Sequence, residues 1–243
     1  MAQIIMIASG KGGTGKSTVA TFLATELAQS GKKTFLTELD TGLRSIDIIS
    51  GTSENAVYDI GDVLHGVISA QKAMIVSPYT ENLFIIPAPY KNQEIDFGGL
   101  ATVIKEVEND FDYMIIDTAA GVGDAFYGAL SVANYAIVVA TADRISVRDA
   151  RVVSDEAFAK GIKNIKLIIN KFDKASFKQS GFYDGDEIID ACCAQLLGVI
   201  PQSAEISVKA MKGELLSKDS IEKKIFTAMK DRLQGKEQPI LLK

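Results

Sequence analysis

The sequence is poor in the residues that build metal centres and disulfide frameworks. Its 243 residues include one histidine and two adjacent cysteines, Cys192 and Cys193. Adjacent cysteines lack the spacing of a disulfide scaffold or a zinc site, and on a helix they would point about 100° apart. We therefore expect core or half-buried cysteines in a reducing environment. His65, which precedes a glycine, is expected at a helix C-terminus and not in a catalytic site.

Long apolar runs and runs of basic residues are absent as well. Nowhere do 18 apolar residues follow one another, so no membrane-spanning helix is expected. The net charge of −5 disfavours a dedicated nucleic-acid binder. No repeat or low-complexity linker marks a boundary, so residues 1–243 are predicted to form a single domain.

What is present is an alternation of short apolar runs with longer helical patterns. The runs are continuously apolar, which is typical of strands buried on both faces: Ile4–Ala8, Lys33–Leu39, Leu83–Ala88, Tyr113–Asp117, Tyr135–Ala140, Lys166–Asn170 and Leu197–Pro201. Helical patterns cover Ser17–Gln29, Leu100–Asn109, Val147–Lys160, Glu187–Leu196 and Ile221–Leu233. The alternation predicts an α/β fold with three α/β/α layers and a mostly parallel central sheet. In such sheets ligands bind at the carboxyl ends of the strands.

One loop carries a phosphate-binding motif. Gly10–Ser17, GKGGTGKS, matches G-x-x-x-x-G-K-[ST] between a predicted strand and a predicted helix. The motif predicts a P-loop NTPase in which Lys16 contacts the β- and γ-phosphates and Ser17 holds Mg²⁺. The glycine spacing does not fit a dinucleotide-binding loop. The expected nucleotide contacts are Gly10, Lys11, Gly12, Gly13, Thr14, Gly15, Lys16, Ser17 and Thr18.

Lys11 is a second lysine that a generic phosphate loop does not need. With it, KGGTGKST resembles the deviant Walker A sequence of the MinD/ParA family of P-loop ATPases. The resemblance extends from Met1 to about Leu242. It implies a homodimer closed by ATP, in which Lys11 reaches the phosphates bound to the partner and acts as an arginine finger does elsewhere. The alternative is a solvated lysine that only adds positive potential.

Two further segments resemble this family. Thr37–Gly51, TELDTGLRSIDIISG, is similar to its switch I region, matching at Asp40, Gly42, Leu43, Arg44 and Asp47. The resemblance implies that Asp40 orients the attacking water, making Lys11, Lys16 and Asp40 the expected catalytic residues; Asp40 could instead be an exposed turn acid. Tyr113–Gly123, YMIIDTAAGVG, resembles a Walker B strand ending in Asp117, with Ala119 where the family usually has proline. The expected Mg²⁺ site comprises Ser17, Glu38, Asp40 and Asp117, with Glu38 in place of the family's usual aspartate and acting through water.

The base-binding segment allows two interpretations. Asn170–Asp173, NKFD, matches the N-K-x-D pattern that reads guanine in GTPases. The family instead reads adenine with an asparagine at this place and with a segment like GVIP, which ends here at Pro201. We favour adenine, with Asn170, Lys171 and Pro201 as contacts and Asp173 as a surface acid. Asn170 could also be only a strand-end cap.

The segment Ala142–Arg151, ADRISVRDAR, is similar to the partner-binding helix of MinD members of the family. It suggests partner contacts by Arg148, Asp149 and Arg151, together with Arg44, although a capped, charged first helical turn explains the same residues. The tail after Leu233, GKEQPILLK, is too short for the amphipathic membrane helix that these members carry. We expect an anchor that is either truncated or absent.

The resemblance implies an ATPase that uses ATP and Mg²⁺ as a dimerisation switch in placing the division site. It further implies a regulatory protein that stimulates hydrolysis. We expect a cytoplasmic location, peripheral on the inner face of the cell membrane only through partners or through an anchor that has been truncated. The alternatives are a flagellum-placing or DNA-partitioning ATPase, a metal-cluster assembly ATPase and a nucleotide-binding scaffold that does not hydrolyse. Nucleic acid is disfavoured by the acidic charge, and cluster assembly by the adjacent cysteines.

Overall fold

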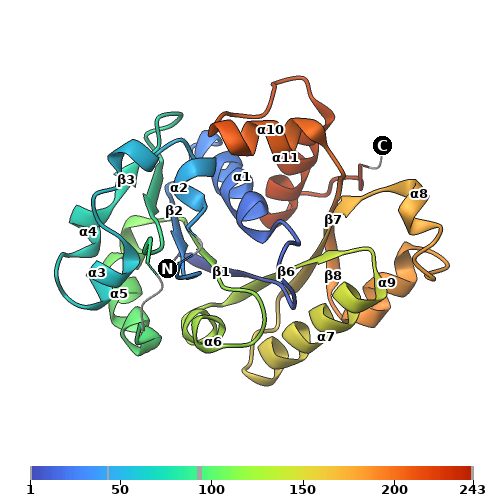
Figure 1. Ribbon diagram of the computed structural model, residues 1–243, viewed down its shortest axis with the longest axis horizontal. Helices are drawn as coiled ribbons and strands as arrows, with labels where there is room; N and C mark the ends of the chain where they lie inside the picture. Colours follow the sequence, from blue (N-terminus) through green and yellow to red (C-terminus); the bar gives the residue numbers. More distant parts are fainter. Residues whose placement is uncertain (1, 43, 92–94, 242–243) are drawn as a thin grey trace.

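The computed structural model describes residues 2–42, 44–91 and 95–241, which form three layers (Figure 1). Over these residues a central sheet of eight strands has helices on both faces, so the predicted α/β/α arrangement is confirmed. The strands are β1 (Gln3–Ala8), β2 (Thr34–Glu38), β3 (Ile75–Val76), β4 (Leu83–Ile86), β5 (Tyr113–Asp117), β6 (Tyr135–Thr141), β7 (Ile165–Phe172) and β8 (Gln195–Pro201).

Most of the helices lie between consecutive strands, and the last two follow β8. The helices are α1 (Lys16–Gln29), α2 (Ile46–Ile49), α3 (Ile60–Leu64), α4 (Ala70–Ala73), α5 (Leu100–Val107), α6 (Asp124–Leu130), α7 (Arg144–Ala159), α8 (Lys174–Phe177), α9 (Gly185–Cys192), α10 (Ala204–Lys212) and α11 (Ile221–Leu233). No helix in the described part of the chain is long and apolar enough to span a bilayer.

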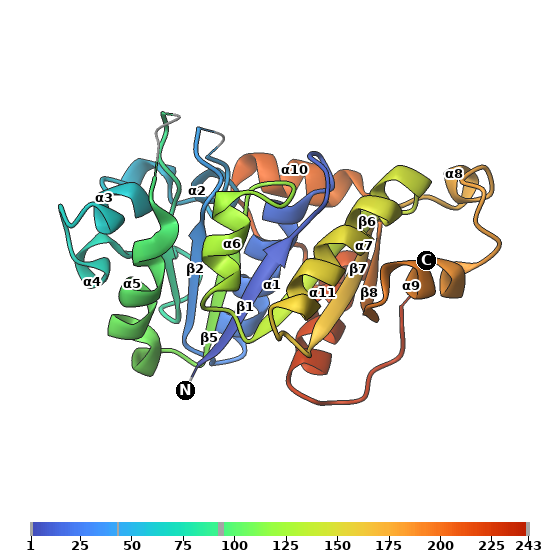
Figure 2. The same cartoon turned by 90° about the horizontal axis from the view of Figure 1, so that it is seen from below.

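The strand order places the functional loops together. The sheet runs β3-β4-β2-β5-β1-β6-β7-β8, and all neighbouring pairs are parallel except β3 with β4. Parallel strands end at the same edge, so the loops after β1, β2, β5, β6, β7 and β8 meet there. Figure 2 shows the loops after β1 and β2 leaving the sheet at this same edge.

Two apolar cores lie on the two faces of the sheet. In β1, Ile5 and Ile7 face a core shared with α1, α10 and α11, while Met6 and Ala8 face a core shared with α5, α6, α7 and α9. All four of these side chains are at most 1% exposed. Burial on both faces explains why the strands read as continuously apolar. On its face α11 packs against α1, with Phe226 and Phe22 in edge-to-face contact.

Several boundaries differ from the sequence-based expectation. The predicted helix over Glu187–Leu196 ends at Cys192, because Cys193 adopts the left-handed conformation with φ 49° and β8 begins soon after. The predicted helix over Val147–Lys160 begins at Arg144, because Asp143 caps it by accepting from the Ser146 N–H. The strand β3 and the helices α2, α4, α6, α8 and α10 were not among the predicted elements, and of α3 only the C-terminal end was expected, from His65.

Candidate active site

The phosphate loop joins β1 to α1, and its glycines shape it. Gly13 and Gly15 have φ angles of 78° and 85°, in the left-handed region that favours glycine. Gly10 allows close packing instead, since a Cβ there would lie 2.4 Å from Asp149 backbone in α7. An added Cβ at Gly12 or Gly13 would meet no atom within 4 Å, so the mouth of the loop is open. This shape fits a phosphate chain.

Lys16 and Asp117 form a buried ion pair beside this loop. Lys16 Nζ lies 2.7 Å from Asp117 Oδ1, and the two side chains are 7% and 0% exposed. Burial raises the pKa of the Asp117 carboxyl, and its contacts with Lys16 and Ser17 oppose that rise. The second carboxylate oxygen, Oδ2, is buried without a hydrogen-bond partner among the described residues. Such an oxygen suits Mg²⁺ or its bound water, so these residues fit the ion.

Glu38 lies directly across from Asp117, at matching positions of β2 and β5. Its two carboxylate oxygens accept hydrogen bonds from the Ser45 N–H, the Ser45 hydroxyl and the Ile46 N–H at 2.7 to 3.2 Å. Burial, together with the nearby Asp117 charge, raises the pKa of Glu38 to about 7. Glu38 therefore anchors the first turn of α2 in this structure. Its expected role near Mg²⁺ stays a prediction.

Asp40 belongs to the same electrostatic cluster. Burial raises the pKa of its carboxyl, the Lys16 ammonium lowers it, and the Asp117 charge raises it further. Asp40 also lines a cavity of about 690 Å³ that includes Ala119 and the N-terminal residues of α6. His65 lines the same cavity and occupies the C-cap of α3, the helix end at which it was expected. The catalytic role of Asp40 stays a prediction that this position supports.

A cavity of about 360 Å³ lies beside the phosphate loop. The three predicted base contacts, Asn170, Lys171 and Pro201, all line it. Apolar side chains from α2 and α10 form further walls, among them Ile48 and Ile206. A mostly apolar cavity with a few polar groups suits a purine ring.

The acid of the N-K-x-D pattern does not face that cavity. Asp173 lines a different one, and its carboxylate accepts from the Ser176 N–H at 2.7 Å, which caps α8. This hydrogen bond holds the pKa of Asp173 below its ordinary value. Reading guanine requires the carboxylate to reach the base, so the geometry favours adenine, as predicted.

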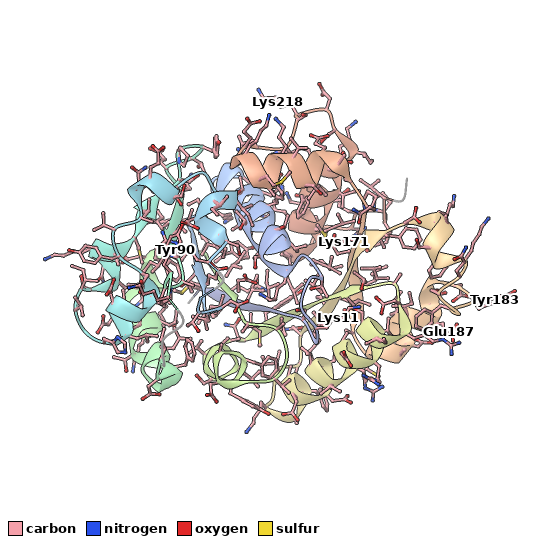
Figure 3. The ribbon with its side chains drawn as sticks, in the orientation of Figure 1. Lys11, Tyr90, Lys171, Tyr183, Glu187 and Lys218 are labelled. Carbon is pink, nitrogen blue, oxygen red and sulfur yellow. The ribbon has the colours of Figure 1, made fainter. Side chains whose placement is uncertain are left out.

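Lys11 points away from the interior of its own loop. Its Nζ lies 3.0 and 3.2 Å from the two carboxylate oxygens of Asp143, the N-cap of α7 (Figure 3). Burial acts to raise the pKa of Asp143, but hydrogen bonds from Thr141, Ser146 and Lys11 hold it below its ordinary value. This contact gives Asp143 a role that was not predicted from the sequence. The only signal for it was an acid at a helix N-cap just after a strand end.

The predicted partner-binding residues separate into two groups. Arg148 and Arg151 on α7 present side chains that are 75% and 44% exposed, and each pairs with an acid of the same helix. Asp149 is the acid beside Arg148, and its side chain is 25% exposed. These three remain candidates for a partner surface.

Arg44 differs from that prediction. Its side chain is 8% exposed, with Nε 2.7 Å from Asp47 Oδ2 and the guanidinium 4.9 Å from the centre of the Tyr90 ring. This geometry does not favour a partner contact, because the charge of Arg44 is already used to hold the loop before α2. Leu43, the neighbouring residue of the switch I pattern, lies outside the described residues.

With this geometry established, comparison with known proteins identifies the family. A family model described as "ParA: NUBPL iron-transfer P-loop NTPase" matches residues 1–234. The chain belongs to the MinD/ParA family of P-loop ATPases. The septum site-determining protein MinD of Helicobacter pylori is 35% identical over 98% of this chain and 92% of its own length. Among solved structures, the MinC:MinD cell division protein complex of Aquifex aeolicus matches with a TM-score of 0.90 and 31% identity over 99% of each chain. MinD of Pyrococcus horikoshii, complexed with Mg-ADP, matches with a TM-score of 0.86 and 25% identity over 96% of each chain.

Membership of the MinD/ParA family confirms the predicted class of enzyme. The chain is an ATPase with a P-loop NTPase fold, and its cofactors are ATP and Mg²⁺. The roles of individual side chains rest on the geometry described above.

Proposed function

We propose that this protein is a dimerisation switch, driven by ATP binding and hydrolysis, that acts in placing the cell division site. The names of its relatives, septum site-determining proteins, support the process. A related solved structure is named a MinC:MinD complex, which supports a regulatory protein partner here. The cytoplasm, with peripheral attachment to the inner face of the cell membrane through partners, is the proposed location.

The position of Lys11 is the observation that carries the proposal. Its ammonium is held outside the phosphate loop by Asp143, in an ion pair whose side chains are 35% and 44% exposed. An ion pair this exposed contributes about 1 kcal/mol or less. Lys11 can therefore leave Asp143 at little cost when a more strongly charged group faces it. The triphosphate bound to a second copy of the chain is such a group.

The other charged residues then have separate tasks. Lys16 exchanges its contact with Asp117 for the β- and γ-phosphates of its own nucleotide. Ser17 and Asp117 hold Mg²⁺, which neutralises phosphate charge when bound. Asp40 orients the attacking water, and the partner's Lys11 stabilises charge on the transferred phosphoryl group. Hydrolysis breaks the bond between the β- and γ-phosphates, and when the inorganic phosphate dissociates the partner's Lys11 loses its contact and the dimer separates.

Sedimentation with ATP tests the proposal. We expect Asp40→Ala protein, impaired in hydrolysis, to accumulate as an ATP-bound dimer. Lys11→Ala should abolish both the ATP-induced dimer and turnover, while the monomer still binds nucleotide, because the Lys11 ammonium points away from the interior of its own loop. An Asp40→Ala protein that stays monomeric at saturating ATP would rule out the switch.

The name of the matching family model raises iron transfer as a second candidate. The cysteines do not support it, since Cys192 is buried and Cys193 is exposed. Over the described ranges, no group of three or more His, Cys, Asp or Glu side chains is arranged to hold a metal ion. Stoichiometric iron after anaerobic purification would favour this candidate. Salt-sensitive retention on DNA in the presence of ATP would favour DNA partitioning instead.

A further inference from the structure

Lys171 has a backbone conformation that is rare for a residue with a side chain. Its φ is 54°, and Cys193 is the only other non-glycine residue with positive φ in the part of the chain that the structure describes. The strain falls at an irregularity in the pairing of β7 with β8, between the pairs Ile169–Val199 and Phe172–Pro201. Two residues of β7 there oppose one residue of β8, which defines a β-bulge. Bulges of this kind redirect side chains and are common beside active sites.

The bulge sends two consecutive side chains to the same loop. In a regular strand, neighbouring side chains point to opposite faces. Here Asn170 Nδ2 donates to the Thr14 carbonyl at 2.7 Å, and Lys171 Nζ donates to the Gly13 carbonyl at 2.7 Å. Lys171 is exposed, and Figure 3 draws it above Lys11 on the face toward the viewer. The two donors therefore hold two adjacent carbonyls of one loop.

These carbonyls need donors for a reason that follows from the function of the loop. A phosphate loop turns its backbone N–H groups inward to an anion, so some of its carbonyls turn outward. If such a carbonyl has no hydrogen-bond partner, nothing restrains the rotation of its peptide unit. Rotation of that unit would turn the adjoining N–H away from the phosphates. Hydrogen bonds at Gly13 and Thr14 fix both peptides before nucleotide arrives.

We propose that Lys171 is a positioning residue that holds the phosphate loop in its binding conformation through the Gly13 carbonyl. This differs from the direct contact with the nucleotide that the sequence suggested. The proposal rests on nucleotide binding at this loop but not on dimerisation. The strained φ of Lys171 is then the cost of directing its ammonium to the loop.

Hydrogen exchange of the nucleotide-free protein, combined with ADP binding, tests this role. Lys171→Met removes the donor and keeps a side chain of similar length. We expect faster amide exchange in residues 9–18 without nucleotide, and ADP affinity weakened roughly three- to tenfold, the loss of one partly exposed charged hydrogen bond. Lys171→Arg, which restores a donor, should recover most of both.

Lys174→Met is the matched control, because it removes an exposed lysine three residues along and outside the base cavity. It should change neither measurement. Weakened ADP binding with unchanged loop exchange in Lys171→Met would show a direct contact with the nucleotide and overturn the proposal. Unchanged ADP affinity would overturn it as well. Neither result involves dimers, so the proposed switch would stand or fall separately.

Discussion

At the scale of residues, the site depends on charged groups buried close together. Lys16, Asp117, Asp40 and Glu38 all follow or face strand ends at one edge of the sheet. Burial penalises their charged forms, and each opposite charge nearby offsets part of that penalty. The effect on protonation is clearest for Glu38, because its pKa is raised to about 7, which is close to neutral pH.

We predict that Glu38 makes the stability of the protein pH-dependent near neutrality. A carboxyl with a raised pKa keeps its proton in the folded state between its ordinary pKa of 4.5 and about 7. The unfolded state binds fewer protons in that window, so the free energy of unfolding falls as pH rises through it. The shift corresponds to about 3 kcal/mol for Glu38 alone.

Denaturant unfolding of the wild type and of Glu38→Gln, at several values from about pH 5 to about pH 8, measures this effect. As pH rises, the free energy of unfolding of the wild type should fall relative to that of Glu38→Gln, so that any advantage of the wild type shrinks or reverses. Parallel profiles over the whole range would mean that Glu38 is ionised throughout.

At the scale of elements, α2 and α10 meet through their backbones. Gly213 ends α10 with φ 63°, and a Cβ there would lie 2.6 Å from the Ile48 carbonyl oxygen and 2.7 Å from Gly51 Cα. The hydroxyl of Tyr79 donates to the Gly213 carbonyl. Both helices line the base cavity. The contact therefore sets the distance between two of its walls.

We predict that Gly213→Ala destabilises the protein by about 2–4 kcal/mol, combining left-handed strain with a steric clash against backbone. It should also weaken ATP binding, since α10 must move away from α2. Gly31→Ala is the matched control, because Gly31 has φ 85° but open space around it. It should cost only about 1 kcal/mol and leave ATP affinity unchanged. Equal losses of stability in thermal unfolding would show that the helix contact adds nothing.

At the scale of the whole molecule, the proposed active site needs two copies of the chain. Each site would combine its own Asp40 with the partner's Lys11. Two variants that are inactive separately should then complement each other. In a mixed dimer of Lys11→Ala with Asp40→Ala, one of the two sites regains both residues.

We predict that mixing equal amounts of these variants restores ATP hydrolysis to at most about one quarter of the wild-type rate. Random pairing would make half of the dimers mixed, each with one complete site, and the weak dimerisation expected of Lys11→Ala lowers that share. Phosphate release by each variant alone gives the background. If the mixture hydrolyses no faster than the variants separately, Lys11 acts within its own chain.

The sequence by itself determined the strand-loop-helix unit around Gly10–Ser17, the buried strands and Asp117 at the end of β5. These features are local, since a run of apolar residues or a glycine loop restricts the backbone wherever it folds. The short helices α2 and α4 were not predicted, because four residues give too weak a periodic signal, and of α3 only the end at His65 was expected.

Only the tertiary structure decided which distant groups meet. Asp143 holds Lys11 across 132 positions, and Lys171 reaches Gly13 across 158. Arg44 was expected at a surface and is enclosed, and Asp173 matches a guanine-reading pattern but caps α8. Such pairings depend on strand order and on a bulge at the end of β7, and neither leaves a periodic signal in the sequence. The role of a residue could be predicted where it depends on one segment of the sequence. Where two distant segments must meet, only the tertiary structure shows which side chains are in contact.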